Sequence, residues 1–245
     1  METTPTRVAL VTGGSGGIGR VVSERLARDG IALAVHYAGN EARANEVVET
    51  ITSAGGRAMT VVGDVADEGD MAEAFDAVEQ SFGGIDVVVH TAGQMILGPL
   101  VKFDLADLDN MIRTNIRGTF VVDQLGARRV RDGGAIVNFS SSVVKIAMPT
   151  YAPYAATKGA VDAVSLILAR ELRGRDITVN VVAPGHTATS LFLDGKDEET
   201  IDNLSKMAPL ERLGTPDDVA EAVAFLAGPA RWVNGQVLYV NGGII

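Results

Sequence analysis

Short apolar segments alternate with amphipathic helical patterns along the whole 245-residue chain, and this alternation limits the possible folds more than any other feature. Strands that are apolar on both faces are typical of parallel sheets, in which helices cover each side. The predicted strands lie at residues 7–12, 31–37, 58–62, 85–89, 135–137, 177–182 and 236–240. The sequence therefore predicts an α/β fold with a doubly wound, parallel, seven-stranded sheet and helices on both faces.

The segments between these strands carry apolar residues at helical spacing. The longest such pattern runs through residues 105–120, and Asp67 is placed to cap another helix at its N-terminus. No linker, repeat or low-complexity stretch divides the chain, so we expect a single domain over residues 1–245. The apolar helix positions are Ile18, Val21, Val22, Leu26, Met71, Phe75, Val78, Phe82, Leu105, Leu108, Met111, Ile112, Ile116, Phe120, Val161, Val164, Leu168, Leu172, Val219, Val223 and Leu226.

Composition narrows the possible partners. Lys and Arg number 21 against 31 Asp and Glu, a net charge of −10 without any basic cluster, so neither nucleic acid nor an anionic membrane is an expected partner. The chain has no Cys, which excludes disulfides and thiolate ligands. No signal peptide and no apolar run of about 18 residues is evident, so we expect a cytoplasmic protein.

The first strand runs directly into the glycine-rich segment GGSGGIG, and a helix follows. A loop of this kind lets a phosphate approach backbone N–H groups at a helix N-terminus. The glycines fit two patterns: Gly14, Gly16 and Gly19 match G-x-G-x-x-G, whereas Thr12, Gly13, Gly17 and Gly19 match T-G-x-x-x-G-x-G. The alternative is a tight turn without a ligand, but the position between strand and helix favours a dinucleotide.

The end of the second strand bears on which dinucleotide binds. An NAD site usually has an acidic residue there, and this chain instead has Tyr37, preceded by His36 and followed closely by Asn40. The absence of a carboxylate favours NADP(H) over NAD(H), although no adjacent Arg is present to hold a 2′-phosphate. His36 and Asn40 are either polar contacts to the cofactor or ordinary turn residues. After the third strand, Asp64 is either an acceptor for the adenine amino group or a turn residue, and Val65 offers its backbone amide.

Residues 134–172 contain the candidate chemistry. Tyr154 and Lys158 are four residues apart, so they share one face if a helix begins by Tyr154. A fixed ammonium group lowers the pKa of a neighbouring phenol from about 10 and enables proton exchange with a carbonyl or hydroxyl oxygen. Ser141, 13 positions before Tyr154, is placed to hold the same oxygen. Taken alone, the Tyr-Lys pair also fits an exposed helix start.

Two further segments stand out. Asn115 lies inside the long helical pattern, where an Asn is usually a surface or interhelix residue; here it can instead open the helix locally and hold a water. Residues 187–213 break the strand-helix alternation, which suggests a mobile substrate loop.

Together these motifs resemble the short-chain dehydrogenase/reductase family in its single-domain form, similar to 3-oxoacyl-[acyl-carrier-protein] reductase-like members. The motifs occur in order from about Arg7 to Gly243: TGGSGGIG, GDV, TAG, Asn115, Ser141, YAATK and PGHTAT. The resemblance implies an NAD(P)-binding Rossmann domain and an oxidoreductase acting on a ketone or secondary alcohol, with no metal. It makes Tyr154 the acid-base and Lys158 its partner on the nicotinamide ribose, while Ser141 positions the substrate oxygen and Asn115 holds the relay water. The implied cofactor contacts, with the glycines above, are Gly13, Ser15, Gly17, Ile18, Gly19, Asp64, Val65, Ala92, Gly93, Tyr154, Lys158, Pro184, Gly185, Thr187 and Thr189.

The chain departs from the family pattern in three places. The usual Asn-Asn-Ala-Gly is His90-Thr91-Ala92-Gly93, and His90 is interpreted as structural rather than catalytic. Gly16 stands where NADP enzymes often have Arg, which weakens the NADP prediction. Ser140 or Ser142 remains an alternative to Ser141.

The leading hypothesis is an NADPH-dependent reductase of an apolar oxo compound, since Met95, Met148, Phe192 and Leu193 lie near the predicted pocket mouth. The alternative is a non-catalytic NAD(P)-binding sensor or scaffold, for which a phenol of lowered pKa has no use. An epimerase or dehydratase is a third possibility, but little chain follows the last strand to form a sugar-binding domain. The resemblance also implies a homotetramer in which the helices of Asn115 and Tyr154 contact other subunits.

Overall fold

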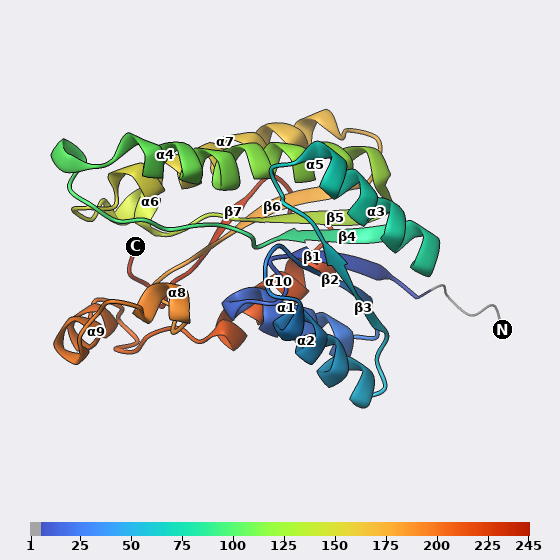
Figure 1. The fold of residues 1–245 in the computed structure, drawn as a ribbon, viewed down its shortest axis with the longest axis horizontal. Coiled ribbons are helices and arrows are strands. Elements are labelled where there is room, and N and C mark those ends of the chain that lie inside the picture. The colour runs from blue at the N-terminus through green and yellow to red at the C-terminus, as the bar shows by residue number, and fades with distance from the viewer. Residues whose placement is uncertain (1–5) are drawn as a thin grey trace.

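The computed structural model describes residues 6–245, which form one seven-stranded parallel sheet with the strand order β3-β2-β1-β4-β5-β6-β7 (Figure 1). All six neighbouring pairs are parallel. The order reverses between β1 and β4, where an open α/β sheet opens a crevice for ligands at the carboxyl ends of its strands. The strands are β1 (Val8–Thr12), β2 (Ala32–Tyr37), β3 (Ala58–Val62), β4 (Ile85–His90), β5 (Val130–Phe139), β6 (Thr178–Pro184) and β7 (Val237–Val240).

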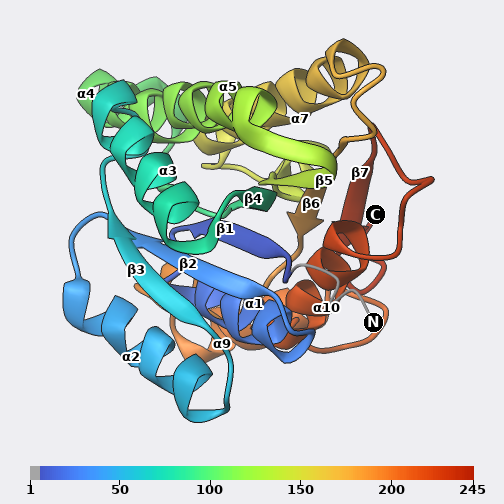
Figure 2. The same cartoon turned by 90° about the vertical axis from the view of Figure 1, so that its right-hand side faces the viewer.

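Helices cover both faces of the sheet, as the two views show (Figures 1 and 2). One face packs against α1 (Gly17–Arg28), α2 (Glu41–Ser53) and α10 (Pro216–Ala227), and the other against α3 (Glu68–Phe82), α5 (Gly118–Arg129) and α7 (Ala152–Glu171). Successive strand residues point to opposite faces, so that Val89 belongs to the first core and Val88 to the second. The doubly wound fold, its seven strands and its single domain are thus confirmed.

Side-chain caps begin several of the helices. Asp67 accepts hydrogen bonds from the N–H groups of Gly69 and Asp70, as its sequence position predicts. Thr215 and Asp218 form a reciprocal capping box at the start of α10. These caps satisfy backbone donors that the first helical turn leaves free.

The long helix predicted over residues 105–120 is interrupted. It consists of α4 (Leu105–Met111), a π-helical turn η2 (Ile112–Arg117) and then α5. The widened turn shifts the phase of the apolar stripe, because a π-helix bonds residue i to i+5. Met111 is buried, whereas Leu105, Ile112 and Phe120 are exposed, so the apolar positions of residues 105–120 do not form one continuous buried face.

Shorter elements lie beside the carboxyl ends of the strands, on the left of Figure 1. They are α6 (Val143–Ile146), α8 (Ser190–Leu193) and α9 (Glu198–Ser205), while the short helix η1 (Leu100–Lys102) precedes α4. The segment 187–213 therefore contains two helices, which the sequence pattern did not reveal. Within residues 6–245, no helix is long and apolar enough to cross a membrane.

Candidate active site

The glycine loop joins β1 to α1 at the switch point of the sheet. Gly13 has φ +65°, and a Cβ there would lie 2.9 Å from the Ala92 backbone. A Cβ on Gly19 would lie 2.3 Å from the Gly13 carbonyl oxygen, whereas one on Gly16 would meet nothing closer than 3.8 Å. Gly14 is also constrained, since a Cβ there would lie 2.8 Å from the Val11 carbonyl oxygen, but Gly16 is not. The T-G-x-x-x-G-x-G pattern is favoured because all its glycines are constrained, including Gly17, where a Cβ would lie 3.2 Å from Thr189.

A groove extends from this loop along the carboxyl ends of β1 to β4. Its walls contain most of the residues predicted to bind the cofactor: Gly13, Ser15, Gly17, Ile18, Gly19, His36, Tyr37, Asp64, Val65, Ala92, Gly93 and Thr189. The remaining predicted residues, apart from Asn40, line the adjoining cavity: Tyr154, Lys158, Pro184, Gly185 and Thr187. Ile18, Gly93 and Thr189 border both spaces. The glycine cradle and the continuous groove fit a dinucleotide.

His36 is a structural support of this groove. Its Nδ1 accepts a hydrogen bond from the Gly13 N–H at 3.3 Å, so its Nε2 carries the proton and donates to the Gly63 carbonyl at 2.9 Å. Burial lowers the pKa of His36 to about 4, which keeps the ring neutral. Asn40 lies outside the groove lining and caps α2 by accepting from the Arg43 N–H.

Asp64 already has a protein partner. Its carboxylate accepts from the Ala66 N–H and forms an ion pair with Arg113. Burial opposes ionisation, but these two contacts together lower the pKa of Asp64. Arg113 lies in the π-turn and lines the groove, and the sequence patterns gave no signal for it.

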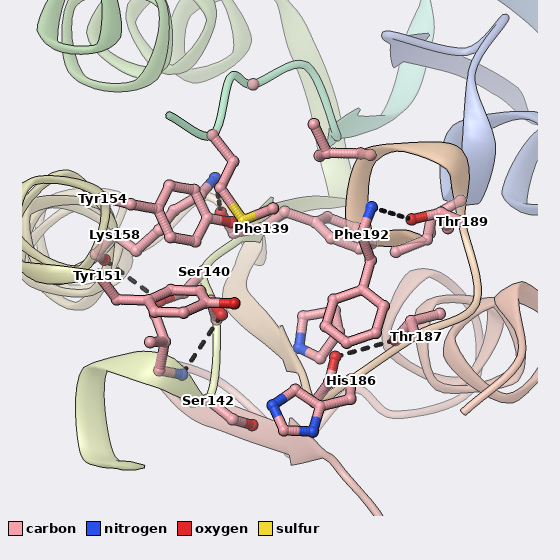
Figure 3. A pocket seen from close by; sticks show the side chains of 18 of the residues that line it. Phe139, Ser140, Ser142, Tyr151, Tyr154, Lys158, His186, Thr187, Thr189 and Phe192 are labelled. Carbon is pink, nitrogen blue, oxygen red and sulfur yellow. Dashed lines mark hydrogen bonds between the residues drawn. The ribbon is translucent and has the colours of Figure 1, made fainter. Parts of the chain in front are cut away.

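Tyr154 and Lys158 lie in the first turns of α7 and face the cavity (Figure 3). The Lys158 ammonium donates to the Phe139 carbonyl at 2.8 Å and lies 5.8 Å from the centre of the Tyr154 ring. Burial lowers the pKa of Lys158 to about 8. Burial also raises the pKa of Tyr154 to about 12, against the smaller lowering effect of a hydrogen bond with Ser141. The lowered phenol pKa that was expected from Lys158 is therefore not found for the chain by itself, because burial raises the pKa of Tyr154 and the contact that lowers it is the one with Ser141.

The three serines are not equivalent. The Ser140 hydroxyl donates to the Lys158 carbonyl at 3.2 Å, and the Ser142 hydroxyl donates to the Ala183 carbonyl at 3.1 Å. Both side chains are buried, whereas Ser141 is only partly buried, and its Oγ accepts from the Val143 N–H at 3.3 Å. Ser141 is thus the serine whose hydroxyl reaches the Tyr154 phenol in the cavity.

Asn115 lies inside the π-turn, where the helix is locally open. Its side chain accepts from the Gln94 N–H and donates to the Gln94 carbonyl, both at 2.8 Å, and it also donates to the Thr157 hydroxyl at 3.0 Å. A Cβ on Gly93 would lie 3.3 Å from Asn115 Oδ1 and 3.4 Å from Lys158 Nζ. These contacts bring Asn115 and Lys158 to the same point beside Gly93.

His90 lies away from the linings of both spaces. Its Nδ1 is 2.7 Å from the Thr12 hydroxyl, which ties the end of β4 to the end of β1. Its Nε2 is buried without a partner among the described residues, and burial lowers the pKa of the ring to about 3. This placement agrees with a structural histidine.

The wall of the cavity is mostly apolar. Met95, Met148 and Phe192 line it as predicted, but Leu191 contributes in place of Leu193, because α8 turns the latter away. Two polar residues that the sequence analysis missed, Tyr151 and His186, also line it (Figure 3). No cluster of three or more His, Cys, Asp or Glu side chains that could hold a metal occurs in residues 6–245.

Known proteins share this fold and sequence over nearly the full chain. The sequence model of a family described as "Enoyl-(Acyl carrier protein) reductase" matches residues 13–245. A short-chain type dehydrogenase/reductase of Picea abies is 41% identical over 97% of this chain and 92% of its own. A 3-oxoacyl-[acyl-carrier-protein] reductase of Staphylococcus aureus is 38% identical over 98% of both chains.

A solved structure extends the likeness to a cofactor complex. A short chain dehydrogenase of Burkholderia cenocepacia in complex with NADP superimposes with a TM-score of 0.91, at 38% identity over 98% of both chains. The sequence similarity, the shared fold and the glycine loop between β1 and α1 all indicate the same family. The chain belongs to the short-chain dehydrogenase/reductase family and is an NAD(P)-dependent oxidoreductase.

Proposed function

We propose that this enzyme reduces the carbonyl group of an apolar oxo compound with NADPH. One observation carries the proposal: Tyr154, Lys158 and Ser141 line a single cavity that opens into the dinucleotide groove beside Gly93. A carbonyl oxygen held by the Ser141 hydroxyl is then within reach of the Tyr154 phenol.

The protonation state of Tyr154 suits it to act as the proton donor in a carbonyl reduction. With a pKa of about 12, Tyr154 is a neutral phenol at physiological pH, which is the form that donates a proton. When bound, the nicotinamide supplies hydride to the carbonyl carbon. Tyr154 gives its proton to the developing alkoxide, and the positive charge of Lys158 stabilises the phenolate that remains. The Phe139 carbonyl holds Lys158 in position, and Asn115, which lies near Lys158 beside Gly93, would hold the relay water.

The preference for NADPH rests on the end of β2. The groove there is lined by His36, Tyr37 and Ala38, none of which carries a negative charge that would repel a 2′-phosphate. The NADP complex of the Burkholderia relative supports the same preference. His36 acts indirectly, by holding the Gly13 N–H and the Gly63 carbonyl in place.

The substrate loop at residues 187–213 would cover the cavity. Thr189 caps α8, and Phe192 of that helix stacks on His186 with ring centroids 5.2 Å apart. Lys196 packs on Phe192, with its Nζ 4.6 Å from the ring centre. This apolar cover suits a substrate without a charge near its carbonyl.

We also propose a homotetramer. Phe120 on α5 and Ile167 on α7 are 48% and 57% exposed, although both lie on long, otherwise well-packed helices. Large apolar side chains exposed in this way mark surfaces that contact another chain.

The test uses purified protein, NADPH and a panel of ketones, diketones and 3-oxoacyl thioesters, with loss of NADPH absorbance as the readout. Tyr154→Phe should lower kcat by ~10²–10⁴-fold and leave NADPH binding nearly unchanged. Tyr239→Phe, which removes a phenol outside the cavity, is the matched control. Cofactor binding without turnover of any substrate, in either direction, would favour the sensor or scaffold function instead.

A further inference from the structure

Tyr151 places a second phenol in the substrate cavity. It directly precedes α7, three residues before Tyr154, and its side chain is only 9% exposed. Both tyrosines line the cavity, and their hydroxyl groups point across it toward the wall formed by Phe192 and His186 (Figure 3). The cavity thus offers two phenol oxygens from the same side.

The Tyr151 hydroxyl has no hydrogen-bond partner among residues 6–245, and burial is the one influence on its pKa, which is raised. The group is therefore a neutral O–H that can donate and accept. Because this hydroxyl faces the cavity, a ligand atom that pairs with it adds a hydrogen bond that the protein does not itself make there, and so gains affinity. Three residues of the same cavity, Val143, Ile146 and Met148, have apolar side chains that cannot pair with it.

The opposite wall provides little competition for a polar substrate group. His186 donates its Nδ1 proton to the Leu204 carbonyl at 3.1 Å, so the Nε2 of the neutral ring has no proton to give a substrate oxygen, and the ring is stacked on Phe192. A second polar atom on the substrate is therefore best satisfied on the side of α7, next to the reacting oxygen.

We propose that Tyr151 is a specificity-determining residue that binds a second oxygen of the substrate, on the carbon next to the reacting carbonyl or one carbon further. Side chains three positions apart at a helix start have Cβ atoms ~5–6 Å apart. Two oxygens of one small molecule span such a pair of hydroxyls when they are borne on adjacent or next-but-one carbons. The substrate class is thus dicarbonyl compounds, hydroxyketones and oxo esters or thioesters rather than isolated ketones. This inference rests on the proposed reductase function.

Tyr151→Phe tests the inference, because it removes only the oxygen. The wild type and the variant are compared on 2-pentanone, 2,3-pentanedione and 2,4-pentanedione, which share one carbon skeleton. The ratio of kcat/KM for dione over monoketone should fall roughly five- to ten-fold in the variant, mostly through a higher KM. Because the comparison is between two proteins, the greater intrinsic reactivity of diones cancels. Tyr239→Phe should leave the ratio unchanged.

A second readout does not depend on turnover. In a Tyr154→Phe background with bound NADPH, the Kd for each dione, measured by the change in NADPH fluorescence, should rise by a similar factor when Tyr151→Phe is added.

The outcomes separate the two proposals. An unchanged ratio, or an equal loss for monoketone and diones, would overturn the role of Tyr151 while leaving the reductase function intact. Failure of the wild type to reduce any of the three compounds or the wider panel would overturn the reductase function, and this inference with it.

Discussion

The Lys158 ammonium is held between the Phe139 carbonyl, at 2.8 Å, and the face of Tyr154, 5.8 Å from the ring centre. Burial lowers the pKa of this lysine to about 8, so its positive charge is present below pH 8 and is lost as the pH rises through that value. In the proposed mechanism this charge stabilises the phenolate left on Tyr154 after proton donation. We therefore predict that kcat for ketone reduction falls on the alkaline side with an apparent pKa near 8.

Lys158→Arg is the control for this profile. Arginine stays charged to pH 12 and above, so the variant, although slower because its planar group fits the site poorly, should lose the alkaline limb. An inflection near pH 8 that persists in the arginine variant would assign it to another group.

The serine triplet yields a second prediction. Ser141→Ala should lower kcat by roughly 10²-fold, because it removes the hydroxyl that holds the substrate oxygen. Ser140→Ala and Ser142→Ala should instead lower the free energy of unfolding by about 1 kcal/mol each, since their hydroxyls donate to the buried Lys158 and Ala183 carbonyls. Steady-state kinetics and urea unfolding of the three variants decide the matter. The assignment is wrong if Ser140→Ala or Ser142→Ala, rather than Ser141→Ala, loses turnover with its stability retained.

The glycine loop provides a matched pair for cofactor binding. Alanine at Gly19 would place a Cβ 2.3 Å from the Gly13 carbonyl oxygen, whereas at Gly16 the Cβ would make an ordinary van der Waals contact with that oxygen at 3.8 Å. Overpacking of this kind costs about 1–3 kcal/mol, so Gly19→Ala should weaken NADPH binding roughly 5- to 150-fold and Gly16→Ala should change it little. Fluorescence titration with NADPH measures both. Equal affinities in the two variants would show that the cofactor does not use this loop.

The sequence predicted the fold well, because buried parallel strands can be recognised as short runs of apolar residues. Six of the seven strands lie within about two residues of their predicted ends, and β5 alone is much longer. Its first half, Val130–Gly134, contains charged residues and two glycines and so carries no strand signal. Tyr154, Lys158, Ser141 and Asn115 could be selected as candidates because the proposed chemistry needs a few residue types at fixed spacing, and their roles stay predictions.

The sequence could not predict features that are set by where side chains point in the folded chain or by local changes in helix geometry. Arg113 reaches Asp64 across 49 positions, and no periodicity predicts such a pair. The π-turn is equally invisible, since the hydrophobic pattern around Asn115 reads as one continuous helix. Tyr151 was overlooked because nothing in the sequence distinguishes a tyrosine three residues before Tyr154. Only the loop geometry shows that its side chain enters the cavity.

The exposed apolar residues on α5 and α7 predict the behaviour of the assembly. Phe120→Glu combined with Ile167→Glu places two charges on the surface proposed to contact other subunits, and the tetramer should dissociate. Light scattering should give the mass of four 25.6 kDa chains for the wild type and a smaller mass for the double variant. Val62→Glu is the control, because Val62 is also exposed but lies on the distant edge strand β3. A wild type with the mass of one chain would refute the tetramer.

Asp123 predicts how stability changes with pH. This carboxyl group is 3% exposed between α5 and β5, and its two oxygens accept from the Asn138 amide at 3.0 and 2.9 Å. Burial raises its pKa to about 7, against the lowering effect of Asn138. In the unfolded chain its pKa is about 3.9, so the folded state binds more protons between these two values. Its contribution to the free energy of unfolding is therefore complete below about pH 4 and is lost as the pH rises to 7.

Asp123→Asn removes this titration and keeps the shape of the side chain. The free energy of unfolding of the variant minus that of the wild type should increase from pH 4 to pH 8 by about 2–4 kcal/mol. The difference is needed because His36 and His90, whose pKa values burial lowers to about 4 and 3, make both proteins less stable in acid. If the free energies of unfolding of Asp123→Asn and the wild type, measured with urea, change with pH in the same way, Asp123 is ionised in the folded protein. Its contact with Asn138 would then compensate for burial.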